Sequence, residues 1–200
     1  MLQNFLSLSS WFVFFMIIEK LGERDLAISH IIRSIYMVLM IPLFGFSSAT
    51  NTLVSNLIGQ GNSDLVMTLI KRVIIMSLAS TLIMFALTHF IPTQILGFYT
   101  NDNELIQASL STLTVISFTM FFFSIAFILF NGVSGTGNTK ASLLFEFITI
   151  TIYLVATHYI AITLKSSLPY VWCTEFIYFS LLGSMSFIYL KWGNWRKVQI

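Results

Sequence analysis

The residues Asn131–Lys140, "NGVSGTGNTK", have the glycine spacing of a loop that could bind nucleotide phosphates. Gly132 and Gly137 stand as far apart as the two glycines of the phosphate-binding pattern G-x-x-x-x-G-K-[ST]. That chemistry needs a lysine directly after the second glycine, whereas here two other residues precede Lys140. A long apolar run also replaces the β-strand that should lead into such a loop. The segment is therefore predicted to be a turn between two buried helices.

Four ionisable side chains lie inside long apolar runs, where a charge is costly and a functional role is the first hypothesis. Arg33, Glu146 and Glu175 are each about 9 Å from the end of their runs at the helical rise of 1.5 Å per residue, and His30 is shallower and is interpreted as an interface residue. At that depth a hydrated, interfacial position is the alternative to lining a substrate or ion pathway. Arg33 and Glu175 are expected at the same depth on the outer side, where they are candidates for an ion pair.

Two amides, Asn51 and Asn56, are further candidates for a pathway because they stand close together among hydroxyl residues. Hydrogen bonding between helices is the alternative interpretation. The aromatic stretch "SFTMFFFSIAF" could bind cations, although lipid-facing or packing phenylalanines are the simpler interpretation. Trp192 and Trp195, beside several basic residues, are typical of an interfacial anchor.

Other kinds of site are not supported by the sequence. The single Cys173 excludes an intrachain disulfide and a cysteine-based metal site. The motifs H-E-x-x-H and G-x-S-x-G do not occur, and neither does a pair of intramembrane aspartates, so no enzyme is predicted. No catalytic residue, metal or cofactor is expected. The net charge of +2 is too small to indicate nucleic acid as a partner.

The composition of the chain indicates which kind of fold holds these side chains in place. The chain has 200 residues, of which 56% are hydrophobic and 9% charged, whereas soluble domains carry roughly 25% charged residues. A chain with so few charges belongs in a lipid bilayer. Six apolar runs are long enough to cross it, so the fold is predicted to be an all-α polytopic membrane protein with spans at about 2–18, 27–58, 73–91, 104–133, 141–164 and 170–190. Pro42 predicts a kink in the second span, and Asn101 is the predicted N-cap of the fourth.

The basic residues outside the spans predict the orientation. The side of the membrane that holds both termini carries six of them (Lys71, Arg72, Lys140, Lys191, Arg196 and Lys197), and the other side carries three (Lys20, Arg24 and Lys165). By the positive-inside rule both termini are expected to be cytoplasmic, in the cell (inner) membrane.

Four segments occur in the order and spacing of one family. "LGERDLAISHI", "IPLFGFSSATNTLVSNLIGQGN", "GFYTND" and "NGVSGTGNTK" resemble the second half of MATE (multidrug and toxic compound extrusion) transporters. The resemblance covers essentially the whole chain and implies one lobe of six helices out of two. Acidic residues that bind the coupling ion in some branches of that family fall here on Ser7 and Phe123, so that carboxylate pair is not carried over.

The resemblance implies secondary active efflux of small amphiphilic or cationic substrates in exchange for Na⁺ or H⁺. It also implies that the missing N-terminal lobe, in the same polypeptide or in a separate chain, is a partner alongside the lipid bilayer. A single lobe is expected to be inactive alone. The alternatives are a lobe of a lipid-linked oligosaccharide flippase of the same superfamily and a non-transporting membrane subunit.

Overall fold

Helices make up all the secondary structure in the part of the chain that the structure describes. This computed structural model describes residues 2–197, and the side chains of Leu2, Asn4, Arg196 and Lys197 fall outside that description. The elements in chain order are α1 (Leu2–Glu19), α2 (Glu23–Gly59), η1 (Ser63–Leu65), α3 (Val66–Phe90), α4 (Pro92–Gly97), α5 (Asn103–Gly135), α6 (Thr139–His158), η2 (Tyr159–Thr163), α7 (Leu168–Trp172), α8 (Thr174–Trp192) and η3 (Asn194–Lys197).

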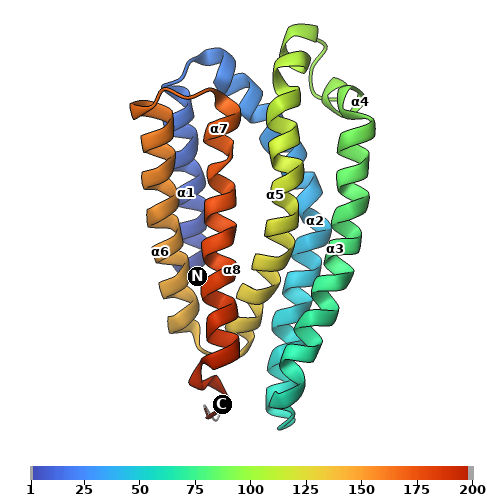
Figure 1. Cartoon of the computed structure of the whole chain (residues 1–200), viewed down its shortest axis with the longest axis vertical. Coiled ribbons are helices and arrows are strands. Elements are labelled where there is room, and N and C mark those ends of the chain that lie inside the picture. Colours follow the sequence, from blue (N-terminus) through green and yellow to red (C-terminus); the bar gives the residue numbers. More distant parts are fainter. Residues whose placement is uncertain (1, 198–200) are drawn as a thin grey trace.

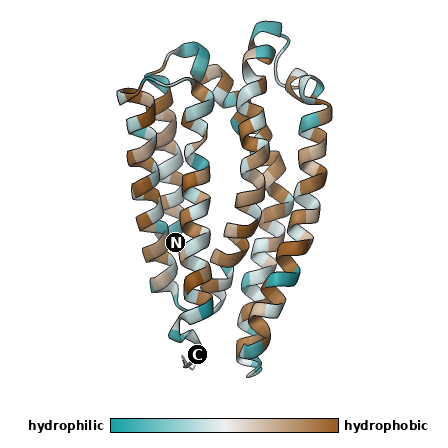
Figure 2. Ribbon diagram, in the orientation of Figure 1, coloured by the Kyte–Doolittle hydropathy of each residue, from teal (hydrophilic) through white to brown (hydrophobic). Residues whose placement is uncertain are grey.

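Five helical segments of the described chain are long and apolar enough to cross a bilayer, and they correspond to the last five predicted runs. They are Glu23–Gly59, Ser63–Phe90, Asn103–Gly135, Thr139–Thr163 and Leu168–Trp192. α1, which matches the first run, is a shorter apolar helix. The fold is therefore the expected all-α, multi-pass membrane protein. Figure 2 agrees with this, because hydrophilic residues gather at the connections at both ends and hydrophobic residues dominate between them.

The helices form two groups that share α5 (Figure 1). α1, α6 and α8 stand together on one side, and α2, α3 and α5 stand on the other. α5 packs against α2 and α3 and also against α8. Small residues permit the closest approaches, because a Cβ on Gly183 of α8 would lie 3.1 Å from the Cβ of Ala126 on α5. α5 is thus the wall common to both groups.

Residues 59–63 and residues 135–139 share the pattern G-x-G-N-[ST]. Both segments are tight turns, as predicted for the second of them. Gly61 and Gly137 have φ angles of 77° and 81°, in the left-handed region that glycine adopts without a steric penalty. α5 ends at Gly135 and α6 begins at Thr139. The side chain of Asn138 caps α6 by accepting a hydrogen bond of 3.1 Å from the amide of Ala141. The segment between α5 and α6 therefore reverses the chain, and Gly137 is needed for the turn.

Two local predictions differ from the structure. The N-cap of α5 is Asp102 rather than Asn101, and its carboxylate accepts from the amides of Glu104 and Leu105. Trp195 is buried, and its indole donates to the Leu190 carbonyl, whereas an interfacial anchor would be exposed.

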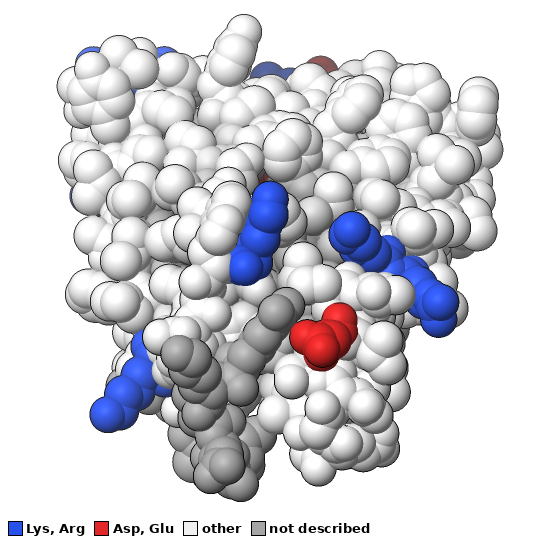
Figure 3. Space-filling view, turned by 60° about the horizontal axis from the view of Figure 1, so that its bottom comes forward, with Lys and Arg blue, Asp and Glu red and all other residues white. Residues whose placement is uncertain are grey.

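The face at the bottom of Figure 1 is rich in basic residues. It contains the turns before η1 and α6 and the end of α8. Figure 3 shows Lys and Arg side chains spread over this face, with little acidic surface between them. The described basic residues at the helix ends nearest this face are Lys71, Arg72, Lys140 and Lys191.

Candidate functional site

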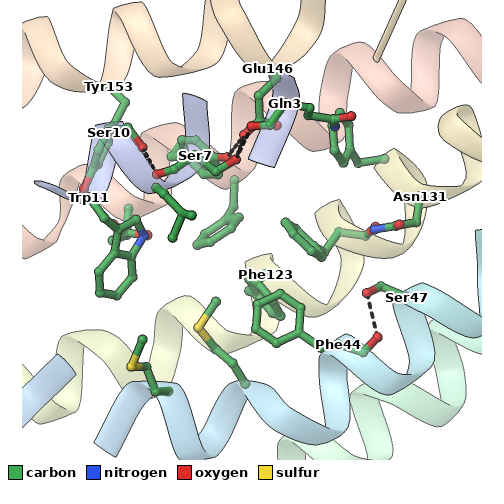
Figure 4. A pocket seen from close by; sticks show the side chains of 18 of the residues that line it. Gln3, Ser7, Ser10, Trp11, Phe44, Ser47, Phe123, Asn131, Glu146 and Tyr153 are labelled. Carbon is green, nitrogen blue, oxygen red and sulfur yellow. Dashed lines mark hydrogen bonds between the residues drawn. The ribbon is translucent and has the colours of Figure 1, made fainter. Parts of the chain in front are cut away.

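A cavity of about 1340 Å³ lies between the two groups of helices. Its walls come from α1, α2, α5, α6 and α8. Figure 4 shows Ser7 and Glu146 on one side of it and Phe44 and Phe123 on the other. Ligand sites in proteins usually have about 300–1,000 Å³, so the space is large enough for a drug-sized molecule.

Two buried carboxylates line the cavity, and hydroxyl groups hold both of them. Glu146 of α6 is 2% exposed and Glu175 of α8 is 4% exposed. The Oε1 atom of Glu146 lies 2.6 Å from the Ser7 hydroxyl of α1 and accepts a hydrogen bond of 2.9 Å from the Tyr178 hydroxyl of α8. The Oε1 atom of Glu175 accepts a hydrogen bond of 2.8 Å from the Tyr153 hydroxyl. Each carboxylate is thus fixed in place by a helix other than its own.

The two tyrosines connect the carboxylates into one polar strip. The rings of Tyr153 and Tyr178 meet edge to face, with centroids 5.5 Å apart. Glu146 and Tyr153 stand seven residues apart on α6, about 10 Å along the axis at the helical rise. The strip therefore follows the interface of α6 and α8 and presents both carboxylates to the same cavity.

Phenylalanines form much of the opposite wall. The Phe123 ring stacks on Phe127 at 4.7 Å and meets Phe44 and Phe179 edge to face at 5.7 and 5.0 Å. Their neighbour Phe122 is instead 45% exposed on the outside of α5. The stretch therefore has an exposed ring on one face of α5 and packed rings on the other, and both agree with the simpler interpretation of lipid-facing or packing phenylalanines.

Arg33 also lines the cavity, but it does not pair with Glu175. Its guanidinium carbon lies 5.1 Å from the centre of the Phe15 ring, and His30 stacks on that same ring at 5.1 Å. The buried Nε atom of Arg33 has no hydrogen-bond partner. Both Arg33 and Glu175 are fully described, and no ion pair joins them. The expected ion pair is therefore wrong. The Arg33 guanidinium packs over the Phe15 ring, and Glu175 accepts a hydrogen bond from the Tyr153 hydroxyl.

Of the two candidate amides, only Asn51 faces the cavity. Asn56 is exposed and is not one of the lining residues, although the two stand on the same helix. Five residues correspond to about 500° of rotation, so the two side chains point in clearly different directions. The grouping of Asn56 with the cavity residues is corrected accordingly.

Tyr153 and Tyr178 are the functional candidates that sequence reasoning missed. Spacing could have indicated them. Tyr153 follows Glu146 by seven residues on α6, and Tyr178 follows Glu175 by three on α8, so each phenol shares a helix face with an acid. Among the described residues, no group of three or more His, Cys, Asp and Glu side chains could hold a metal ion.

The comparisons with known proteins give the family. The MatE family model matches residues 1–164. A curated relative, described as "Probable multidrug resistance protein NorM" of Thermotoga maritima, is 27% identical over 149 residues, which are 74% of this chain and 32% of that protein. The chain thus spans about a third of the length of the curated relative it matches. No solved structure matches the chain. With a match over most of its length, a multi-pass helical fold and a large cavity within the bundle, the chain belongs to the MatE family of membrane transporters and is not an enzyme.

Proposed function

We propose that this chain is one lobe of a secondary active exporter, which moves small amphiphilic cations out of the cell in exchange for Na⁺ or H⁺. The observation that carries the proposal is the cavity with two buried carboxylates facing an aromatic wall. Aromatic faces attract cations, and a carboxylate within a membrane protein needs a compensating positive charge or a proton. An amphiphilic cation has an apolar part that can pack against the rings and a positive charge that the carboxylates attract.

The charges that line the cavity favour a cationic cargo over a phosphate-linked one. Glu146 and Glu175 are two acids, and Arg33 is the one arginine among the lining residues. A lipid-linked oligosaccharide flippase needs several cationic groups to hold its phosphates. The balance of charge therefore disfavours a flippase.

The proposed partner is a second lobe, in the same polypeptide or in a separate chain. Alternating access moves one repeat against another around a site at their interface. This chain supplies the cavity that Glu146 and Phe123 line, and its match covers 32% of the curated relative. The lobe alone is accordingly proposed to insert into the membrane and bind cargo without transporting it.

The proposed orientation places both termini in the cytoplasm of the cell, with the chain in the cell (inner) membrane. Lys71, Arg72, Lys140 and Lys191 stand near the helix ends at the basic face, and Figure 3 shows Lys and Arg side chains over that face. Basic residues favour the cytoplasmic side. The acidic residues Glu19, Glu23, Asp102 and Glu104 stand at helix ends on the opposite face.

Binding of a fluorescent cationic dye to the purified chain in detergent tests the cargo class. Phe123→Ala should weaken binding by roughly 2- to 30-fold, the range set by a cation–ring attraction of about 0.5–2 kcal/mol. Phe122→Ala is the matched control, because it removes the same ring from the outside of the same helix. Equal effects of the two substitutions, or tighter binding of an anionic dye than of the cationic one, would contradict the proposal.

Transport is tested in a host that lacks its own drug exporters. The chain expressed alone should leave cells sensitive to cationic dyes, and co-expression with a first lobe from a MatE relative should restore resistance. Resistance from the chain alone would refute the requirement for a second lobe. Dye binding in vitro, without resistance in any combination, would favour a non-transporting subunit.

A further inference from the structure

A groove of about 340 Å³ lies on the outside of the bundle, between α6 and α8. The described residues that line it are different from those that line the central cavity. Figure 1 shows α6 and α8 side by side, with the end of α8 at the basic face. Two of the lining residues, Ile188 and Trp192, are 54% and 67% exposed, so the groove opens away from the bundle and toward the surrounding lipid. Its lining residues are Phe145, Met185, Ile188, Tyr189, Trp192 and Gly193.

The groove has an apolar wall that runs along α8. Met185, Tyr189 and Trp192 follow one another at intervals of four and three residues, so they share one face of the helix over about 10 Å of its axis. On the other side, the Phe145 ring of α6 meets the Tyr189 ring edge to face at 5.8 Å. The Tyr189 hydroxyl accepts a hydrogen bond of 2.8 Å from the Asn138 side chain. The groove therefore follows the helix direction, as the acyl chains of a bilayer do, and contacts between α6 and α8 hold its shape.

A positive charge stands at the end of the groove that is nearest the basic face. The Nζ atom of Lys191 lies 4.5 Å from the centre of the Trp192 ring and 5.7 Å from that of Phe187. Lys191 and Lys140 are both exposed, and neither forms an ion pair with a carboxylate among the described residues. Asp64 is the one acid at this face, and it belongs to η1, beside α3. The ammonium group at the groove therefore has no fixed counter-charge.

These features together fit a ligand that has an apolar chain and a negatively charged head. A soluble anion would leave the apolar wall uncovered, and an uncharged lipid would leave Lys191 without a counter-charge. Anionic lipids satisfy both requirements, and basic residues near the membrane surface attract them. Trp192 agrees with this position, because tryptophan is enriched at the level of the lipid headgroups.

We propose that this groove is a binding site for an anionic phospholipid, with one acyl chain packed between Phe145 and Trp192 and the phosphate paired with Lys191. The chain would contact both helices, so a bound lipid joins the ends of α6 and α8 at the basic face. The proposal is independent of the cargo, the exchanged ion and the second lobe.

Quenching by brominated lipids tests the site, because bromine on an acyl chain quenches tryptophan fluorescence on contact. The purified chain is placed in bilayer discs of phosphatidylcholine that contain a small fraction of brominated phosphatidylglycerol or, for comparison, of brominated phosphatidylcholine. Subtracting the signal of Trp192→Phe isolates the quenching of Trp192. The anionic lipid should reach half-quenching at a mole fraction about fivefold lower than the uncharged one, the preference conferred by one basic residue near the surface. Equal quenching by the two lipids would overturn the proposal.

Two pairs of variants separate this groove from the membrane surface in general. Lys191→Gln should abolish the preference for the anionic lipid, whereas Lys71→Gln, which removes the same charge from α3 at the same face, should retain it. Ile188→Ser should weaken quenching roughly fourfold, the effect of one buried methylene group. Its control is Ile75→Ser, at a 67% exposed isoleucine of α3. Equal effects within either pair would overturn the proposal. If a groove variant does not fold, the comparison of the two lipids on the unmodified chain still decides.

Inorganic phosphate distinguishes a lipid from a soluble anion. Added to the discs and compared with chloride at the same ionic strength, it should leave the quenching by brominated phosphatidylglycerol unchanged, because it has no chain to occupy the groove. Release of the lipid by phosphate alone would mean that Lys191 binds a soluble anion, and the proposal would then be wrong.

Discussion

Gly135 and Gly59 occupy equivalent positions in the two G-x-G-N-[ST] segments, and the structure predicts opposite responses to the same substitution. Each is the last residue of its helix. A Cβ on Gly135 would lie 2.8 Å from the carbonyl oxygen of Asn51 and 2.9 Å from the Cβ of Val54, both on α2. A Cβ on Gly59 would meet nothing within 4 Å. Gly135→Ala thus forces α2 and α5 apart, and Gly59→Ala does not.

The size of the effect follows from those distances. Non-bonded carbon atoms are in optimal contact at about 3.5–4.0 Å, so the added methyl group overlaps its neighbours by roughly 0.6–1 Å. One of these neighbours is backbone and cannot turn away. Overpacking of this kind costs about 1–3 kcal/mol, a fall in Tm of roughly 2–12 °C for a chain of this size. Gly59→Ala should change stability by less than about 1 kcal/mol, with the favourable sign expected for alanine in a helix.

The assay is thermal unfolding of the purified variants in one detergent, followed by tryptophan fluorescence. Dye affinity is a second readout, because the side chain of Asn51 lines the cavity and its backbone must move in Gly135→Ala. The reasoning is refuted if Gly135→Ala and Gly59→Ala have the same Tm. It is also refuted if the unfolding of Gly135→Ala is unchanged from that of the original chain.

Three smaller predictions test other parts of the structure. Tyr153→Phe should lower stability by about 1–3 kcal/mol in the same assay, because it removes the donor to buried Glu175; an unchanged Tm would contradict this. Gly137→Ala should cost about 1–2 kcal/mol, since φ is 81°, and an unchanged Tm would mean that the turn can relax. In a background without the native cysteine, single cysteines at Ser63 and Asn103 should label from opposite sides of the membrane. Labelling from one side would refute the topology.

The sequence predicted most of the fold because bilayer thickness fixes the length of a span. The five long helical segments coincide with the last five apolar runs to within about four residues at each end, except that Ser63–Phe90 begins well before its run. The residue at which each helix begins or ends depends on local interactions such as capping hydrogen bonds. Asp102, and not Asn101, caps α5 because its carboxylate reaches two amides of the first turn, and composition alone does not distinguish these neighbours. α3 begins at Val66 instead of near Val73, since helices extend beyond the apolar core.

The cavity was predictable only in part, because its geometry depends on pairs of residues far apart in the chain. Arg33, Asn51, Glu146 and Glu175 could be found as polar residues in apolar runs, and all four line the cavity. Their partners could not be found that way. Glu146 meets a serine 139 residues away, so no local pattern relates the two. The position that lacks a carboxylate in the sequence, Ser7, thus has one beside it in space.

The kinds of contact around the cavity determine which helices can respond to its contents. α5 is held to α2 at Gly135 and to α8 at Gly183 by small residues in close van der Waals contact, and such contacts do not depend on charge. The contact of Ser7 with Glu146 between α1 and α6 is a polar one and changes its donor when the acid gains a proton. A change in the charge of Glu146 therefore acts on the contact between α6 and α1, and α1 forms one side of the cavity. The contacts of α5, by comparison, hold α2 and α8 in the same way whatever the charge of Glu146.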